Sequence, residues 1–290
     1  MIIKKINKDN PVIAWWSGGI ASAVTCFLCI HWFGIENVRV VFIDTHNEDP
    51  DTYRFKNDCE QWYGCKIESI CSSEFTSIEQ VWFKFLSLNV AKGAICSTHL
   101  KMAVREQFQR ENRYSYQAFG FDISELDRAI SMKLNHPDSR PIFPLIIELI
   151  NKKKCMEYLP AGLFKIEPPN AYKMGYENNN CLETMCVQGG IGYWQKVGRE
   201  KVDKFDAMAS REHKLTDLKG EPVTMLKDQG KDGGLVFLKP HPNYPNIKDI
   251  SMMKGREPKP LFECNGFCGT NDLSKRSETE MEINYDFKYQ

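Results

Sequence analysis

The chain has 290 residues, balances 38 Lys and Arg against 38 Asp and Glu, and is 42% hydrophobic. This length and apolar content are enough for one large domain, or for a domain with an appendage, and they exclude a wholly disordered chain. Because the formal net charge is +0, the overall field does not attract nucleic acid. Any such binding would need a local basic patch or a partner.

The apolar runs of the chain bear on its location. The lysines near the start, Lys4 and Lys5, are not followed by an apolar stretch of signal-peptide length. The longest apolar runs, at residues 24–33 and 142–150, have roughly half the length that a membrane span needs. We therefore expect a cytoplasmic protein with no membrane partner. Thiols stay reduced in that compartment, so the 11 cysteines are not expected to form a disulfide framework.

Short β-type runs alternate with helical patterns in the first part of the chain, as is typical of a parallel sheet covered by helices. In chain order, the predicted strands are residues 12–16, 38–43, 66–70 and 116–119. The predicted helices occupy residues 22–33, 51–63, 98–108 and 153–158, and another begins at the capping-box pair Ser77 and Gln80.

Glycine and proline are concentrated in the second half, which predicts a loop-rich module there. That module is expected to contain one long amphipathic helix over residues 192–213, whose shared apolar face comprises Tyr193, Trp194, Val197, Val202, Phe205 and Met208. The pattern divides the chain into a domain at 1–160, a cysteine-containing module at 161–272 and a polar tail at 273–290.

A glycine pair directly follows the first predicted strand, in the run Ser17-Gly18-Gly19 that leads to Ser22. Glycines let the backbone approach a ligand closely, and the N-terminus of the next helix offers free N–H groups to phosphate. The hydroxyls of Ser17 and Ser22 would add donors. The Walker pattern is absent, which excludes a conventional P-loop NTPase. A tight strand-to-helix turn is the alternative interpretation.

Five segments in order resemble one family. The run Ser-Gly-Gly-x-x-Ser is similar to the phosphate loop of the PP-loop ATP pyrophosphatases. Four later segments resemble the phosphoadenosine phosphosulfate (PAPS) reductase-like branch of that family, at residues 42–55, 94–101, 119–128 and 141–145. The resemblance implies an α/β fold of the adenine nucleotide alpha hydrolase-like type, a parallel sheet flanked by helices, with a loop-rich cysteine-containing C-terminal module. It also implies that ATP and Mg²⁺ are ligands.

The resemblance carries over to individual residues of the site. Ser17, Gly18, Gly19 and Ser22 would hold the phosphates of ATP. Asp44, at the carboxyl end of the second strand, would lie near ATP or its Mg²⁺, and a turn aspartate is the alternative.

Many family members have Lys-Asp in the phosphate loop where this chain has Ile20-Ala21, so another cation must offset the triphosphate. Lys101 is the expected replacement, with Arg128 as a second phosphate contact. A solvated surface charge is the alternative interpretation of Lys101.

Four cysteines of the second half lie in loops as two close pairs, Cys181 with Cys186 and Cys264 with Cys268. Such pairs in glycine-rich turns suit a tetrahedral thiolate site. The segment around Cys181 also resembles the cysteine-rich extension of PAPS reductase-like bacterial and phage proteins. The expected metal is a [4Fe–4S] cluster or Zn²⁺, a choice that all-thiolate ligation leaves open. Four unrelated cysteines are the alternative.

Three local segments are basic, at residues 152–154, 196–204 and 254–259. Each is most simply a solvated surface, because runs of lysine usually face water. They are also the places where a path for a polynucleotide would lie.

The resemblance implies an enzyme that cleaves ATP to AMP and pyrophosphate by adenylylating a substrate oxygen, which sulfur then replaces. Within the family, the chain most resembles the ATP pyrophosphatase subunits of DNA phosphorothioation systems. The expected acceptor is therefore nucleic acid, and a cysteine desulfurase would supply sulfur.

One alternative is a PAPS or adenylyl-sulfate reductase. Against it, Glu263-Cys264 is followed by Asn265 rather than by the Gly-x-His of those reductases. A second alternative is a non-catalytic nucleotide-binding module, suggested by Ile20-Ala21 in the phosphate loop.

Overall fold

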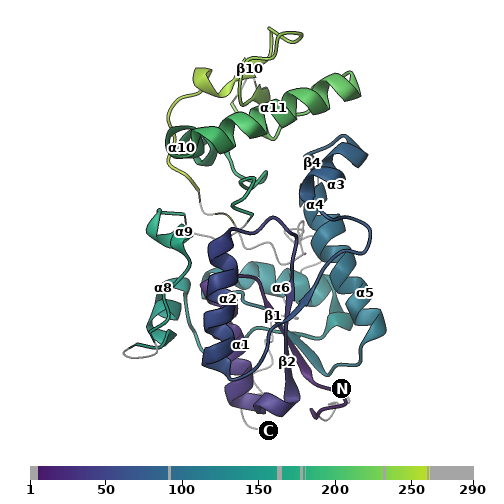
Figure 1. Ribbon diagram of the computed structural model, residues 1–290, viewed down its shortest axis with the longest axis vertical. Helices are drawn as coiled ribbons and strands as arrows, with labels where there is room; N and C mark the ends of the chain where they lie inside the picture. The colour runs from purple at the N-terminus through teal and green to yellow at the C-terminus, as the bar shows by residue number, and fades with distance from the viewer. Residues whose placement is uncertain are drawn as a thin grey trace.

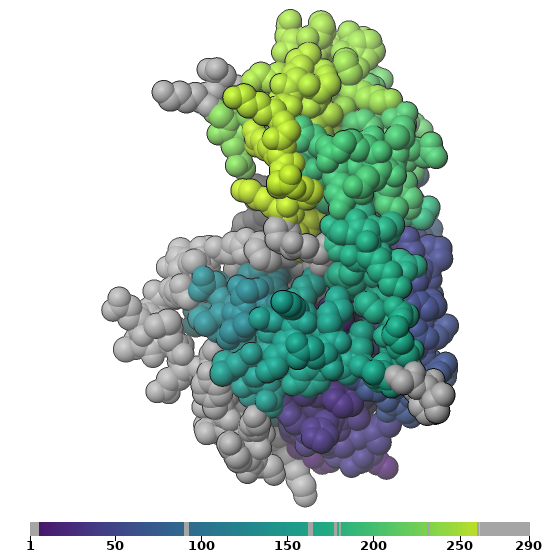
Figure 2. All heavy atoms as spheres, turned by 90° about the vertical axis from the view of Figure 1, so that its left-hand side faces the viewer, coloured from purple at the N-terminus to yellow at the C-terminus, as the bar shows by residue number. Residues whose placement is uncertain are grey.

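The computed structural model describes residues 6–90, 93–161, 165–176, 179, 181–230, 233–259 and 261. These residues form two tiers (Figure 1): a lower tier around a parallel sheet, and an upper tier of helices and a small sheet from the second half of the chain. Figure 2 shows the same tiers from the side, with the yellow segment that ends the described chain running down the upper tier. No helix among the described residues is both long and apolar enough to cross a membrane.

The lower tier confirms the predicted α/β fold. Its five strands pair in parallel, in the order β3-β2-β1-β6-β7. Their bounds are β1 (Val12–Trp16), β2 (Val38–Ile43), β3 (Glu68–Ile70), β6 (Tyr116–Ala118) and β7 (Pro141–Ile142). The order runs outward from β1 in both directions, so the switch point where such sheets bind ligands lies between β1 and β6. The sequence predicted the first four, and missed β7 because two residues show no period.

Helices cover both faces of the sheet, because successive side chains of a strand point to opposite faces. Ala14 and Trp16 of β1 pack with α1 (Ile20–Phe33) and α2 (Pro50–Tyr63). Ile13 and Trp15 pack with α5 (Ala103–Glu111) and α6 (Leu126–Asn135) on the other face. The far side of α1 packs on residues in and around two short helices, α7 (Pro144–Ile147) and α8 (Lys152–Cys155). Helix α1 is therefore buried on most sides, as its apolar sequence predicts.

The region between β3 and β6 differs in detail from the prediction. Helix α3 (Ile78–Phe85) begins as expected, with the Ser77 hydroxyl accepting a hydrogen bond from the Gln80 N–H at 3.3 Å. The helix expected at 98–108 instead begins three residues earlier and has three parts: α4 (Ile95–Ser97), a π-helical turn (Thr98–Met102) and α5. The short strands β4 (Asn89–Val90) and β5 (Gly93–Ala94) precede it. Because π-helical turns often mark functional sites, the burial of Lys101 within this one is informative.

The prediction of one long helix over residues 192–213 is wrong. The chain forms α10 (Ile191–Glu200) and α11 (Val202–Lys219), separated by Lys201 with φ −139° and ψ 59°. The break lets α11 fold back, so that the Phe205 ring lies 6.4 Å from that of Trp194. A methyl group added to Gly198 would lie 3.3 Å from the same ring. The helical spacing of apolar residues continues through such a break, so the break cannot be predicted from the sequence.

The rest of the upper tier was not predicted in detail. It contains a three-stranded sheet in the order β10-β9-β8, formed by β8 (Leu226–Asp228), β9 (Gly234–Phe237) and β10 (Lys248–Asp249), whereas α9 (Asn170–Lys173) lies beside α1 at the lower tier. The Glu212 carboxylate on α11 is fully buried and accepts hydrogen bonds from the N–H groups of Met225, at 3.1 Å, and Leu238, at 2.7 Å. Burial raises the pKa of Glu212 to about 8.

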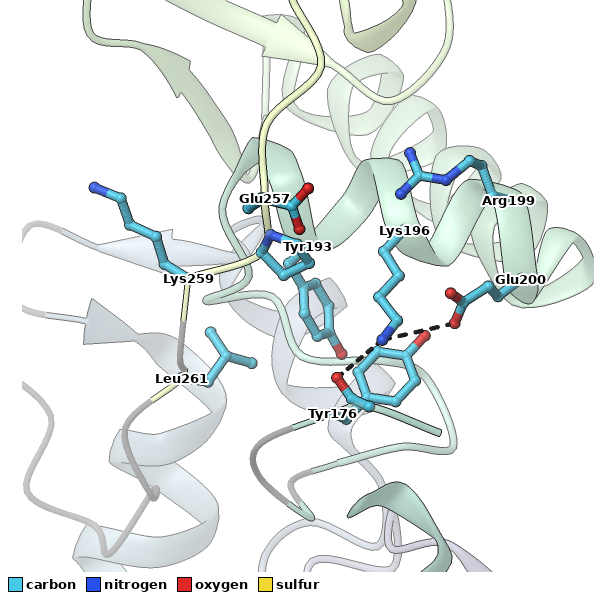
Figure 3. A pocket seen from close by; sticks show the side chains of 10 residues that line it. Tyr176, Tyr193, Lys196, Arg199, Glu200, Glu257, Lys259 and Leu261 are labelled. Carbon is cyan, nitrogen blue, oxygen red and sulfur yellow. Dashed lines mark hydrogen bonds and ion pairs between the residues drawn. The ribbon is translucent and has the colours of Figure 1, made fainter. Parts of the chain in front are cut away.

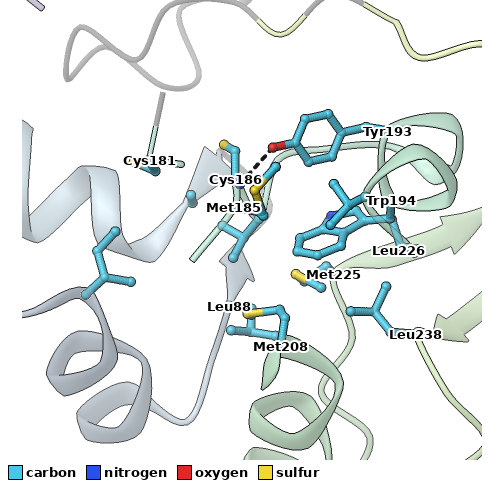
Figure 4. Close-up of a cluster of buried hydrophobic side chains, with 14 of the residues drawn as sticks. Leu88, Cys181, Met185, Cys186, Tyr193, Trp194, Met208, Met225, Leu226 and Leu238 are labelled. Carbon is cyan, nitrogen blue, oxygen red and sulfur yellow. Dashed lines mark hydrogen bonds between the residues drawn. The ribbon is translucent and has the colours of Figure 1, made fainter. Parts of the chain in front are cut away.

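One cluster of buried side chains joins the two tiers (Figure 4). Trp194, Met208 and Met225 of the upper tier belong to the same cluster as Trp82 and Leu88 of the lower tier. The upper tier therefore rests on the segment that contains α3 and α4 through apolar contact, and the loop that carries Cys181 and Cys186 lies within this packing.

Candidate functional site

The predicted phosphate loop lies at the carboxyl end of β1 and is organised by Ser22. The Ser22 hydroxyl accepts a hydrogen bond from the Ser17 N–H at 2.9 Å and donates one to the Gly19 carbonyl at 2.8 Å. Helix α1 starts at Ile20 without a side-chain cap and without an acidic residue in its first turn. The positive end of the helix dipole thus faces the loop, as an anion site requires, although the first N–H of the helix, that of Ile20, is donated to the Tyr172 hydroxyl.

Two glycines allow neighbouring elements to approach this loop. Gly18 has a φ of +85°, and a Cβ added there would lie 2.8 Å from Cγ2 of Thr52 on α2. Gly120, two residues after β6, lies so close to α1 that an added Cβ would be 2.8 Å from both the N and the Cα of Ser22. Side chains at these positions would push the loop out of place.

Asp44 directly follows β2, the strand beside β1, and its carboxylate is held by its own loop. Tyr53 donates its hydroxyl to the two carboxylate oxygens at 2.9 and 3.1 Å, and the His46 N–H donates at 2.8 Å. Burial and the hydrogen bond to Asp44 raise the pKa of Tyr53, which keeps its hydroxyl a donor. Because parallel strands end at the same edge of a sheet, Asp44 lies at the edge where the phosphate loop begins.

The two predicted phosphate-binding cations have different surroundings. Lys101 is 5% exposed, and its charge acts on Cys181, whose pKa is raised by burial and partly lowered by Lys101. Arg128 forms an ion pair with Glu125, and its guanidinium lies 4.5 Å from the centre of the Phe121 ring. Lys101 thus lies near Cys181. Arg128 would have to release the Glu125 carboxylate before it could bind a phosphate.

We call residues 179 and 181–186 the cysteine loop. Cys181 and Cys186 are both 9% exposed, and the thiols of Cys186 and Cys96 lie near enough to Cys181 to reinforce the burial-driven rise of its pKa. Cys264 and Cys268 lie outside the described residues. Within the described ranges, no three His, Cys, Asp or Glu side chains are arranged to hold a metal ion. The cysteine loop therefore offers two of the four predicted thiolates, and the metal site stays a prediction.

The cysteine loop is tied to the phosphate loop and to the loop after β2. The side-chain amide of Asn179 donates hydrogen bonds to the Gly18 carbonyl at 3.1 Å and to the Thr52 hydroxyl at 2.9 Å. The amide of Asn47, in the loop after β2, donates to the Thr184 hydroxyl at 2.8 Å. The structure thus brings the predicted phosphate loop, Asp44 region and first cysteine pair together.

Sequence reasoning missed several residues of this site. Asn179 and Thr52 were not singled out, although an asparagine run directly precedes Cys181. Tyr172 was also missed, and its hydroxyl accepts a hydrogen bond from the Ile20 N–H at 3.1 Å, at the start of α1. Cys96 was not among the four cysteines expected to bind a metal. These contacts join residues far apart in the chain, which no local pattern records.

A pocket of about 350 Å³ is lined by α10 and by residues 175–176, 257–259 and 261 (Figure 3). Tyr193 lines the pocket, and its hydroxyl accepts a hydrogen bond from the Cys186 N–H at 3.2 Å. Two of the three basic segments meet there, contributing Lys196, Arg199 and Lys259, together with Glu200 and Glu257. Lys196 Nζ lies 4.5 Å from the centre of the Tyr176 ring and donates to the carbonyls of Met174 and Gly175, both at 2.9 Å.

Residues 11–116 match the family model of the phosphoadenosine phosphosulfate reductase domain. The matched segment runs from the residue before β1 to the first residue of β6, and so includes the phosphate loop, Asp44 and Lys101 but not Arg128. The match confirms the predicted resemblance to PAPS reductase-like proteins over these residues. No curated protein matches the chain closely enough to count as a relative.

Three solved structures are similar in shape. The PAPS reductase of Candida auris, in a phosphate complex, has a TM-score of 0.44 and 16% identity, covering 58% of this chain and 80% of its own. The NMN synthetase of Francisella tularensis has a TM-score of 0.33 and 15% identity, covering 74% and 79%. A tRNA thiolase of Methanococcus maripaludis, with its [4Fe–4S] cluster, has a TM-score of 0.33 and 13% identity, covering 89% and 85%.

Proposed function

We propose that the chain is an ATP pyrophosphatase that adenylylates a substrate oxygen so that sulfur can replace it. One observation carries the proposal: a loop suited to phosphate and a buried loop with two thiols are joined directly by Asn179. A phosphate loop alone suits many nucleotide enzymes, and buried thiols alone suit a structural role. Together at one sheet edge, they suit a reaction that uses ATP and sulfur in succession.

The chemistry follows from these positions. An oxygen of the acceptor attacks the α-phosphorus of ATP, the bond to the β-phosphate breaks, and pyrophosphate leaves into the phosphate loop. The amides at the start of α1 and the hydroxyls of Ser17 and Ser22 stabilise the charge that leaves. Asp44 would hold Mg²⁺, and Lys101 would supply the cation that Ile20-Ala21 lacks. A sulfide donor then attacks the activated carbon or phosphorus, its bond to the adenylylated oxygen breaks, and AMP leaves. A persulfide donor would instead leave a disulfide between acceptor and donor, whose S–S bond a further thiol must cleave to release the thiolated product.

The predicted metal centre would serve the second step if it is a cluster. Cys181 and Cys186, with Cys264 and Cys268, would hold a [4Fe–4S] cluster or Zn²⁺. A cluster would carry sulfur to the acceptor, whereas zinc would only stabilise the fold. The burial of Cys181 and Cys186 suits either metal, because burial raises the pKa of Cys181 and a bound cation would offset the cost of ionising it.

We propose nucleic acid as the acceptor and a cysteine desulfurase as the sulfur source. The pocket that Tyr193 connects to Cys186 supports a phosphate-bearing acceptor, since its three cations, Lys196, Arg199 and Lys259, outnumber its two carboxylates, Glu200 and Glu257. The chain has no net charge, so this confined basic site, rather than the overall field, would attract the phosphates.

The proposal is tested by incubating the protein with ATP and Mg²⁺ and separating the products. We expect AMP and pyrophosphate, and a strong loss of both in Ser22→Ala, which removes the hydroxyl that organises the phosphate loop. Ser210→Ala is the matched control, because Ser210 also donates to a carbonyl of its own helix, that of Asp206 at 2.9 Å, but in the upper tier. Release of ADP and phosphate would refute the proposal.

A PAPS or adenylyl-sulfate reductase is the second candidate, favoured by the family match over residues 11–116. In that reaction a cysteine thiolate attacks the sulfur of the phosphosulfate, the nucleotide leaves, and a dithiol reductant such as thioredoxin then releases sulfite. Sulfite release from PAPS or from adenylyl sulfate in the presence of thioredoxin, without pyrophosphate release from ATP, would favour the reductase over the pyrophosphatase.

A further inference from the structure

Asn179 makes the direct link between the cysteine loop and the phosphate loop. It is 3% exposed, and the two donors of its side-chain amide are both used, one on Gly18 and one on Thr52. Gly18 is also where the backbone has a φ of +85° and where the Thr52 methyl leaves no room for a side chain. The bridge is therefore made at a point of the phosphate loop that is sterically fixed.

The chain between this bridge and the first thiol is short. Cys181 follows Asn179 by two residues, which span at most about 7 Å even when extended. The far end of the cysteine loop is held separately, by the Asn47 amide on the Thr184 hydroxyl at 2.8 Å, by the Glu183 N–H on the Asn47 carbonyl at 3.4 Å and by the Cys186 N–H on the Tyr193 hydroxyl at 3.2 Å. One end of the cysteine loop is thus attached to the Gly18 carbonyl through Asn179, and the other end is attached to the loop after β2.

We propose that Asn179 is a positioning residue that couples occupancy of the phosphate loop to order in the cysteine loop, an inference that rests on the proposed function. An anion held by the loop N–H groups fixes the peptide planes around Gly18, and hydrogen bonds in a chain strengthen one another. The Gly18 carbonyl then holds Asn179 more firmly, and the cysteine loop with it. The thiols are thereby ordered when the phosphates are in place, and ordering them tightens phosphate binding in return.

The test is hydrogen exchange on the full chain as purified, with inorganic pyrophosphate as the probe so that no turnover is needed. In the wild type, pyrophosphate is expected to slow exchange in residues 17–23 and also in residues 181–187, by about 5-fold or more in the latter, the lower end of typical coupling. Asn179→Asp keeps the shape of the side chain but, when ionised, cannot donate; its negative charge and the lost coupling also weaken pyrophosphate binding, so pyrophosphate is raised until slowing at 17–23 is saturated. At that concentration, slowing should persist at 17–23 and vanish at 181–187.

Two further variants separate coupling from simple loosening. Asn47→Ala removes the side-chain tether on Thr184 and leaves the backbone bond from Glu183 to Asn47, so exchange in the cysteine loop should rise with and without pyrophosphate while the ratio stays that of the wild type. Thr52→Val removes one of the two acceptors of Asn179 and should give an intermediate ratio. It serves as the test if Asn179→Asp does not fold.

Each outcome decides the inference. Full slowing at 181–187 in Asn179→Asp would show that coupling does not run through this side chain. Slowing at 17–23 without slowing at 181–187 in the wild type would overturn the inference and leave the proposed function standing. No slowing at 17–23 at all would overturn both, because pyrophosphate would then not bind the phosphate loop.

Discussion

Gly120 offers the sharpest test of how the phosphate loop is held. Gly120→Ala would place a Cβ 2.8 Å from the N and the Cα of Ser22 and 3.1 Å from the carbonyl carbon of Ala21. Carbon atoms pack at about 3.5–4.0 Å, so the start of α1 must move by roughly 0.7 Å relative to β6. These atoms are backbone on a buried helix, and no flexible side chain can absorb the shift.

The expected cost has two parts. Overpacking of this kind destabilises by about 1–3 kcal/mol, which for a chain of this size lowers the melting temperature by roughly 2–12 °C. A misplacement approaching 1 Å at a site of chemistry costs up to about 100-fold in rate. We therefore expect pyrophosphate release from ATP to fall by about 10- to 100-fold at a temperature where the variant is still fully folded.

The assay combines calorimetric unfolding with pyrophosphate release, and Gly234→Ala is the control. Gly234 begins β9 in the upper tier, and a Cβ added there would meet no atom within 4 Å. If Gly120→Ala behaved like Gly234→Ala in both measurements, the start of α1 would be free to move, and the argument that a rigid helix end binds phosphate would be wrong.

Three further predictions concern the phosphate loop, the upper tier and the thiols. Gly18→Ala and Gly220→Ala both introduce a side chain at positive φ, +85° and +74°, and each should lose about 1–2 kcal/mol of unfolding free energy for that reason. Only Gly18→Ala, whose Cβ meets Thr52 at 2.8 Å, should also lose pyrophosphate binding in titration calorimetry. Equal pyrophosphate binding by the two variants would contradict this prediction. Burial raises the pKa of Glu212 from 4.5 to about 8, so between these values the folded chain holds a proton that the unfolded chain releases, and the unfolding free energy should fall as pH rises through this range. Glu212→Gln should remove that part of the slope in urea titrations at several pH values, and parallel slopes would contradict the assignment. Cys181→Ser should abolish bound iron or zinc in elemental analysis of anaerobically purified protein, and unchanged metal content would remove Cys181 from the ligands.

The sequence predicted those parts of the fold whose signal is local. Strand β1 is a run of buried apolar residues, β2 is one except at Arg39, and α1 is apolar on most faces, so the sequence alone indicates that these elements are buried. Strand β7 and the small sheet of the upper tier were missed because two to four residues carry no period. The break at Lys201 was missed because the apolar stripe continues through it, and only tertiary packing of Phe205 explains it.

The site residues also divide into those with a local sequence signal and those without one. The phosphate loop could be predicted because Ser17, Gly18 and Ser22 lie within six residues of chain, and their chemistry depends on that closeness. The hydrogen bond from Asn179 to Gly18 joins residues 161 positions apart, and the burial of Lys101 beside Cys181 depends on a π-helical turn. Such contacts are decided by how two tiers pack, which a single sequence does not reveal.

The shared apolar cluster has a consequence for how the polypeptide is made. Trp82 and Leu88 are synthesised long before Trp194 and Met225, which cover them in the finished molecule. Until the later residues emerge, the nascent lower tier exposes a large apolar surface of the kind that chaperones recognise and that promotes aggregation. Residues 1–160 expressed alone would keep that surface permanently, so successful truncation of this protein would require polar replacements on α3 rather than a new end point.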